Sequence, residues 1–178
     1  MICFGSSEAQ RNKQKKEAGS VDQRQYADSL SLQQLKVKAY YAIEEGDFRK
    51  AVDVLKQLTK TDVEAELMRG FAYYSLGEAD SALYFFDSTL ALNENYLPAY
   101  LYATSLCLEQ EAYQLALHYA SKGLALAPED LNLRFYQGIC QAELGNLDSA
   151  CSNLAKAYYG GLDDAEGYLI QYCYGEQD

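Results

Sequence analysis

The sequence lacks several features that would assign a function directly. None of its apolar stretches approaches the roughly 20 unbroken residues that span a bilayer, so no integral membrane segment is expected. It contains one histidine, and no Gly-rich loop that could cradle a phosphate. The hydrophobic content is nevertheless 49%, which is too high for a disordered chain. A chain of 178 residues can bury one ordinary core or stack several short repeats.

Basic residues are scarce in the second half of the chain. The net charge is −11, and residues 70 to 178 hold 3 basic and 15 acidic residues, or about −12. Such a surface repels phosphate backbones and anionic lipid, so neither nucleic acid nor a membrane surface is an expected partner. A basic or apolar protein partner fits better, although acidity also serves simply to keep a small protein soluble.

The five cysteines form no recognisable framework. They are an odd number, without a C-x-x-C pair or a Cys/His cluster: Cys3, Cys107, Cys140, Cys151 and Cys173. Neither a disulfide framework nor a zinc site is therefore indicated. Free cysteine behaves as a small hydrophobic side chain, so we expect these residues to be reduced and to fill gaps in the core.

The sequence shows no residues arranged for catalysis, which needs a base or nucleophile beside partners that tune it. His118 has no motif around it and is expected to be an exposed or half-packed helix residue. Two clusters of carboxylates, within residues 44–47 and 163–166, lack the spacing of a calcium loop and are expected at helix ends. We therefore expect no enzyme, no cofactor and no metal site.

The first 25 residues are polar, locally basic and without periodicity, which is typical of a flexible tail. Within the stretch CFGSSEAQ, Ser7 and Ala9 have the spacing of small residues before a secretory cleavage site. The charged start and the apolar stretch of about 7 residues that a signal peptide needs are not there. The expected location is the cytoplasm. The alternative is export, if an upstream start supplies the signal, with Cys3 as a lipid-bearing residue.

One pattern recurs four times along the chain, at a nearly constant interval whose first step is slightly shorter than the others. It is marked by four alanines: Ala51, Ala82, Ala116 and Ala150. Four places after each alanine the residue is again apolar: Leu55, Phe86, Ala120 and Leu154. Each alanine lies in a second helical segment, and a glycine precedes that segment in three copies, at Gly46, Gly77 and Gly145. The pattern predicts helix, turn, helix, repeated four times.

These residue types have physical reasons. A sharp link between helices often requires a positive φ, which Gly reaches freely and which costs other residues roughly 1 kcal/mol or more. Where two helices cross closely, only a small side chain lets the backbones approach, so each alanine marks a crossing. The first segment of each copy carries a matching small residue, at Ala39, Gly70, Thr104 and Gly138.

The repeat resembles the tetratricopeptide repeat, whose period the last two intervals between the alanines match. The second copy follows that family's spacing at Gly70, Tyr73, Gly77, Ala82 and Phe86, and the third at Tyr100, Ala116 and Pro128. The resemblance covers about residues 32 to 174. It implies an all-α fold, a right-handed superhelical solenoid of antiparallel helix pairs with about four repeats and a C-terminal capping helix.

The expected organisation is a basic tail over residues 1–25 and one helical repeat domain over residues 26–178. Its units are expected at about 32–62, 63–96, 97–130 and 131–161, with the capping helix at 162–174. Glu111 replaces the turn glycine in the third unit, so that turn is expected to be either strained or differently shaped. The capping helix carries an apolar stripe: Leu162, Ala165, Tyr168, Leu169, Tyr172 and Cys173.

Proteins of this family generally bind peptides on an inner face lined by the first helix of each unit. The equivalent positions here are mostly apolar and aromatic: Tyr40, Ile43, Leu67, Phe71, Tyr74, Leu101, Ser105, Leu108, Phe135 and Ile139. The resemblance does not extend to the clamp that holds acidic chaperone tails, because only Lys36 matches it in type. Such a groove, rimmed by acids, suits an apolar or amphipathic segment with basic flanks. The alternative is that these side chains pack against neighbouring helices.

Two functions stay open from the sequence. The first is a non-catalytic protein-protein interaction module or adaptor that binds a protein segment in this groove. The second is a self-associating structural or envelope-associated scaffold protein, because an exposed apolar face can also pair two copies as a homo-oligomer.

Overall fold

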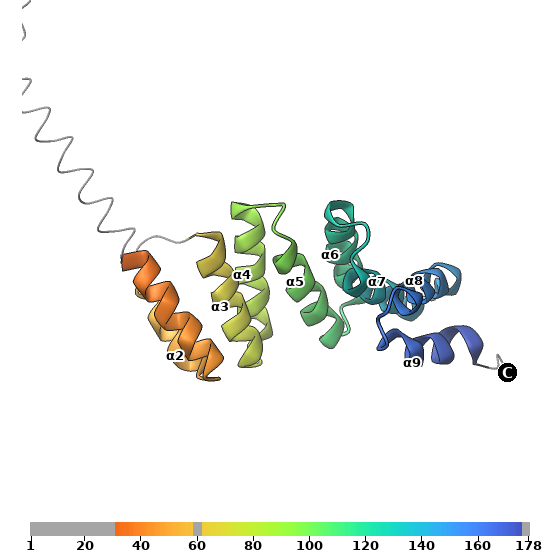
Figure 1. Cartoon of the computed structure of the whole chain (residues 1–178), viewed down its shortest axis with the longest axis horizontal. Coiled ribbons are helices and arrows are strands. Elements are labelled where there is room, and N and C mark those ends of the chain that lie inside the picture. The colour runs from red at the N-terminus through yellow and green to blue at the C-terminus, as the bar shows by residue number, and fades with distance from the viewer. Residues whose placement is uncertain (1–30, 59–61, 176–178) are drawn as a thin grey trace, which may run out of the picture. The chain divides into compact units, whose positions relative to one another are not determined.

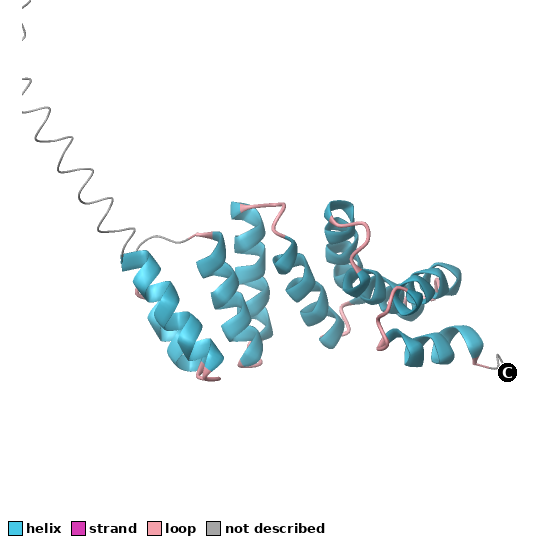
Figure 2. Ribbon diagram, in the orientation of Figure 1, coloured by secondary structure: helices cyan, strands magenta, loops and turns pink. Residues whose placement is uncertain are grey.

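Helices are the regular elements of residues 31–58 and 62–175, which the computed structural model describes, and no strand occurs among them (Figure 1, Figure 2). The chain divides into two compact units, Met1–Thr61 and Asp62–Asp178. The N-terminal tail, including CFGSSEAQ and Cys3, lies outside the described residues.

The described residues of the first unit form one helical pair. A helix over residues 31–44 turns at Gly46 into α2 (Phe48–Leu55). The Asp47 carboxylate caps α2 by accepting a hydrogen bond from the backbone N–H of Lys50 at 3.0 Å. The expected role of this carboxylate cluster at a helix end is therefore confirmed for Asp47. The pair closes over Ala39, Ala51 and Leu55, which are fully buried.

The second unit consists of three helix pairs and a C-terminal segment. The pairs are α3 (Val63–Ser75) on α4 (Ala79–Leu92), α5 (Leu97–Glu109) on α6 (Tyr113–Leu126), and α7 (Leu131–Glu143) on α8 (Leu147–Tyr159). Contacts between α4 and α5 and between α6 and α7 stack the pairs in chain order. The segment α9 (Ala165–Leu169) and η1 (Ile170–Tyr174) then packs on α8. The predicted all-helical fold of paired helices is confirmed.

The turns within the pairs share one backbone conformation. Gly77 and Gly145 have φ of +74° and +82°, and Glu111 at the equivalent position has φ of +56°. The same two backbone hydrogen bonds close the turns at Gly77 and at Glu111. The turn after α5 therefore keeps the shape of the others, and Glu111 bears the strain of a left-handed conformation.

Small residues bring the paired helices together as the repeat predicted. A Cβ atom added at Gly70 would lie 2.5 Å from the ring of Phe86, and one at Gly138 would lie 2.8 Å from Cγ of Leu154. Phe86 and Leu154 are both fully buried, so neither has free space to move into. The repeated alanines are fully buried as well: Ala51, Ala82, Ala116 and Ala150.

The C-terminal segment completes a hydrophobic cluster with α7 and α8. Ala165 and Leu169 are buried beside Leu154 and Ala157. The remaining residues of the predicted apolar stripe pack against the same cluster: Leu162, Tyr168, Tyr172 and Cys173. The segment thus covers the last helix pair.

The expectation of five reduced cysteines is wrong for two of them. Cys151 of α8 and Cys173 of η1 form a disulfide with a Cα–Cα distance of 5.7 Å. The pairing was not readable from sequence because 22 residues separate the two, and only the fold-back of the C-terminal segment brings them together. Cys107 and Cys140 are buried free thiols, as expected. Burial raises their pKa to about 11 and about 12, which leaves them protonated and unreactive.

Candidate functional site

The predicted groove residues of the first unit are Tyr40 and Ile43. Tyr40 is 53% exposed and its ring meets that of Tyr41 edge to face at 5.8 Å. Ile43 is half-buried. Both side chains lie in the unit that ends at Thr61, and they are not part of the site described below.

In the second unit, the first helices of successive pairs touch one another, since α5 contacts both α3 and α7. The predicted residues of α3 and the N-terminal half of α5 are half-buried: Leu67, Phe71, Tyr74 and Leu101. Phe71 packs edge to face on Tyr102 at 5.4 Å. The Tyr74 hydroxyl lies 3.5 Å from that of Ser105 and also donates a hydrogen bond to the carboxylate of Glu109.

A cavity of about 360 Å³, here called the inner cavity, is lined by residues of α5, α6, α7 and α9. Four predicted groove residues line it: Ser105, Leu108, Phe135 and Ile139. Five others complete its wall: Glu109, Tyr113, Tyr136, Glu143 and Tyr168. The structure therefore gathers these four predicted residues into one concave site.

Phe135 and Ile139 form the floor of the inner cavity rather than an open surface. They are only 8% and 9% exposed, because the C-terminal segment packs over them. The ring of Tyr168 meets that of Phe135 edge to face at 5.1 Å. The alternative that the predicted groove residues pack against neighbouring helices therefore applies in part to Phe135 and Ile139.

The carboxylates of the inner cavity are held by tyrosine hydroxyls. Glu109 and Glu143 end α5 and α7, at the same position of successive repeats. Glu109 accepts a hydrogen bond from Tyr74, and Glu143 accepts one from Tyr172. Burial, and then the bond to Glu143, raise the pKa of Tyr172 to about 12.

The charged side chains that line the inner cavity are acidic. Burial, followed by the charges of Glu143 and Glu111, raises the pKa of the Tyr113 hydroxyl above its usual value. No basic residue is among the described residues that line the cavity. The site therefore combines aromatic walls with uncompensated negative charge.

Sequence reasoning missed the acidic and outer aromatic part of this site: Glu109, Tyr113, Tyr136, Glu143 and Tyr168. A signal for two of them was present, since Glu109 and Glu143 are separated by one full repeat. The repeat alone explains why a glutamate recurs at this position. Spacing in the sequence does not show that a side chain at the end of a helix faces a cavity.

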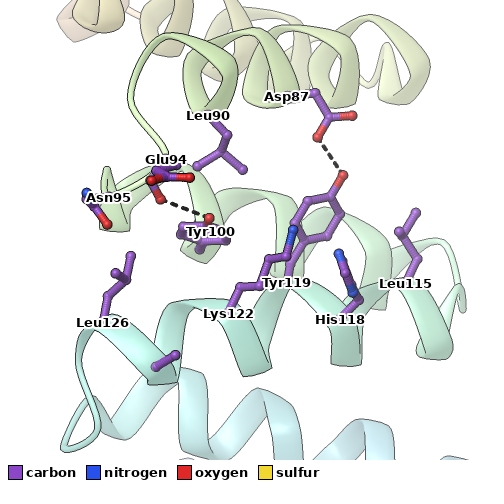
Figure 3. Close-up of a pocket in the computed structure, with 11 residues that line it drawn as sticks. Asp87, Leu90, Glu94, Asn95, Tyr100, Leu115, His118, Tyr119, Lys122 and Leu126 are labelled. Carbon is purple, nitrogen blue, oxygen red and sulfur yellow. Dashed lines mark hydrogen bonds between the residues drawn. The ribbon is translucent and has the colours of Figure 1, made fainter.

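A larger cavity of about 560 Å³ lies between α4 and α6, the second helices of their pairs (Figure 3). The Tyr119 hydroxyl donates to Asp87 Oδ1 at 2.7 Å, and that of Tyr100 donates to the backbone carbonyl of Glu94 at 2.9 Å. His118 and Lys122 stand on α6 at its edge as exposed side chains, as the sequence predicted for His118. None of the predicted groove residues lines this cavity.

Two other features, a metal-binding cluster and a membrane-spanning helix, are absent from the described part of the chain. Within residues 31–58 and 62–175, no group of three or more His, Cys, Asp or Glu side chains is placed to hold a metal ion. Over the same residues, none of the helices combines the length and apolarity needed to cross a membrane.

The fold and the inner cavity define a helical repeat protein built from stacked helix pairs. Solved structures of MamA share this fold. One covers 96% of this chain and 100% of its own length, with 20% identity and a TM-score of 0.69. MamA 41-end from Desulfovibrio magneticus RS-1 covers 80% of this chain and 79% of its own, with 23% identity and a TM-score of 0.68.

A third structure, MamA AMB-1, is 24% identical over 78% of this chain and 76% of its own, with a TM-score of 0.67. Likeness at these identities shows a common fold alone. No protein-family model matches the sequence, and no curated protein matches it.

Proposed function

We propose that this chain is a non-catalytic protein-interaction module that binds an extended or helical segment of a partner protein along α3, α5 and α7. The observation that carries the proposal is the inner cavity, where Ser105, Leu108, Phe135 and Ile139 meet in one concave site. On α3, which contacts α5, Leu67 and Phe71 add half-buried apolar side chains.

The chemistry of this surface suits peptide binding. Tyrosine offers a large contact area with two rotatable angles and keeps a polar hydroxyl for hydrogen bonding. The rim of the proposed binding surface is acidic. A segment with apolar anchors and basic flanks therefore complements this surface in both shape and charge.

A blocking substitution at Ser105 tests this proposal. Ser105 is half-buried and lines the inner cavity, so Ser105→Trp should fill the site without removing a core side chain. Phe135 is a poor choice, because a charge there would enter the hydrophobic cluster and lost folding would look like lost binding. The matched control is Ser152→Trp, on the exposed surface of α8.

The measurement compares partner proteins captured by the immobilised full chain and by the two variants, with melting temperature recorded for each. We expect the wild type and Ser152→Trp to retain the same partner and Ser105→Trp to lose it while keeping its melting temperature. A partner retained equally by all three proteins would refute binding at the inner cavity.

The second candidate, an exported self-associating scaffold, is favoured by two observations. A disulfide joins Cys151 to Cys173, and disulfides persist mainly in oxidising compartments. At the C-terminal end of the second unit, large hydrophobic side chains are exposed: Tyr159, Ile170 and Tyr174. Sedimentation at several concentrations tests self-association, and a strict monomer rejects it. Thiol labelling of the protein taken directly from cells tests the compartment, since reduced Cys151 and Cys173 would favour the cytoplasm.

A further inference from the structure

The inner cavity combines aromatic rings with carboxylates in a way that peptide binding in general does not require. Its wall contains four rings and two carboxylates: Tyr113, Phe135, Tyr136, Tyr168, Glu109 and Glu143. The faces of aromatic rings carry negative partial charge and attract organic cations, and a nearby carboxylate adds a full charge to that attraction.

Neither carboxylate has a basic partner in the described part of the chain. Ion pairs in that part of the chain use other carboxylates, among them Glu45, Glu66 and Glu129 with Lys50, Arg69 and Arg134 respectively. Glu109 and Glu143 instead accept hydrogen bonds from neutral tyrosine hydroxyls, which orient them but do not neutralise them. Each retains a second oxygen that can accept a hydrogen bond from a ligand.

The surrounding charge favours a cation as well. Residues 62 to 178 hold 4 basic and 18 acidic residues, a net charge of about −14. The volume of about 360 Å³ is within the range of about 300–1,000 Å³ that is usual for ligand pockets. A hard metal ion fits less well, because it requires several oxygen ligands and would gain little from the rings.

We propose that the inner cavity takes the side chain of a lysine or arginine from the bound segment, with the cationic head between Glu109 and Glu143 and the aliphatic stem against the aromatic rings. This inference rests on the proposed function and specifies which residue of the partner is recognised. Apolar residues on either side of that basic residue would lie along α3 and α5, against Leu67, Phe71 and Leu101.

The probe is a displayed library of random peptides selected on the full chain. Chosen peptides are then synthesised in three forms, with the basic residue intact, acetylated on the lysine, or replaced by alanine. Acetylation removes the charge and keeps the stem, so it separates recognition of the cation from packing of the chain. The protein variants are Glu109→Gln with Glu143→Gln, Ser105→Trp, and the control Glu94→Gln at the edge of the larger cavity.

We expect selected peptides to share one lysine or arginine beside apolar residues. Acetylation of the lysine should weaken binding about tenfold, as loss of a charge-assisted contact predicts. The double glutamine variant should lose most of the preference for the charged peptide, and Glu94→Gln should keep it.

The two proposals fail in different ways. Peptides that bind without a basic residue, or equally well when acetylated, overturn the cation site, and they leave the proposed function standing if Ser105→Trp still abolishes binding. A charge preference that the double glutamine variant retains also overturns it. Binding that survives Ser105→Trp, or a library that yields no binder, overturns both.

Discussion

The hydroxyl of Tyr172 in η1 donates a hydrogen bond to the carboxylate of Glu143 at the end of α7. One repeat earlier, the equivalent carboxylate of Glu109 accepts a bond from Tyr74 of α3. The C-terminal segment therefore does more than cover the last hydrophobic cluster, because it supplies the tyrosine that orients one of the two carboxylates of the inner cavity.

Removal of the disulfide should loosen this segment. The double variant Cys151→Ser/Cys173→Ser should be less stable than wild type by up to about 3 kcal/mol, the loop-closure entropy for a separation of 22 residues. Urea unfolding with and without reductant measures this. Reductant should shift the midpoint of the wild type and leave that of the double variant unchanged, and an unshifted wild type would contradict the prediction.

A methyl group at Gly138 should be costly. Gly138→Ala places a Cβ atom 2.8 Å from the buried Leu154, so we expect a loss of about 1–3 kcal/mol in the free energy of unfolding from overpacking. The matched control is Gly167→Ala in α9, where a Cβ atom meets nothing within 4 Å and helix propensity should improve. Equal stability of the two variants in thermal or urea unfolding would argue against the tight crossing of α7 and α8.

Replacement of Glu111 by glycine, the residue found in the other turns, should stabilise the turn after α5. Glu111 has φ of +56°, so Glu111→Gly should raise the free energy of unfolding by about 1 kcal/mol through relief of that conformation. The reciprocal variant Gly77→Ala, at φ of +74°, should lower it by a similar amount. Relative to wild type, the unfolding midpoint should rise for Glu111→Gly and fall for Gly77→Ala. A lower midpoint for Glu111→Gly would show that the Glu111 side chain has another role.

Stability should fall at alkaline pH in a way that depends on Tyr172. Its pKa is raised from 10.0 to about 12 in the folded chain, so the neutral hydroxyl is favoured by folding. The contribution is present below pH 10 and is lost as the pH rises towards 12, because the unfolded state releases the proton first. Unfolding midpoints across this interval should fall less steeply for Tyr172→Phe than for wild type. Identical slopes would show that neither the burial of the Tyr172 hydroxyl nor its bond to Glu143 couples titration to folding.

Much of the fold followed from local rules. Gly77 predicted a turn and Ala82 predicted a close helix crossing, because each feature requires a small residue. The structure contains both features. The regular recurrence of the same residue types then extended the assignment along the chain. The sequence did not decide the shape of the turn at Glu111. In the structure this turn has the same shape as the turns at the glycines, and Glu111 adopts a strained left-handed conformation.

The sequence by itself determined the helix pairs of this protein, their crossings and the acidic character of its surface, since these depend on residues near in sequence and on composition. Tertiary structure alone decided that Cys173 reaches Cys151 and that Phe135 lies under the C-terminal segment as a cavity floor. It also decided that Glu109 and Glu143 face one cavity with four aromatic rings. These relationships join residues that are 22 or more positions apart or that come from four separate helices, so they form only when the helices have packed together.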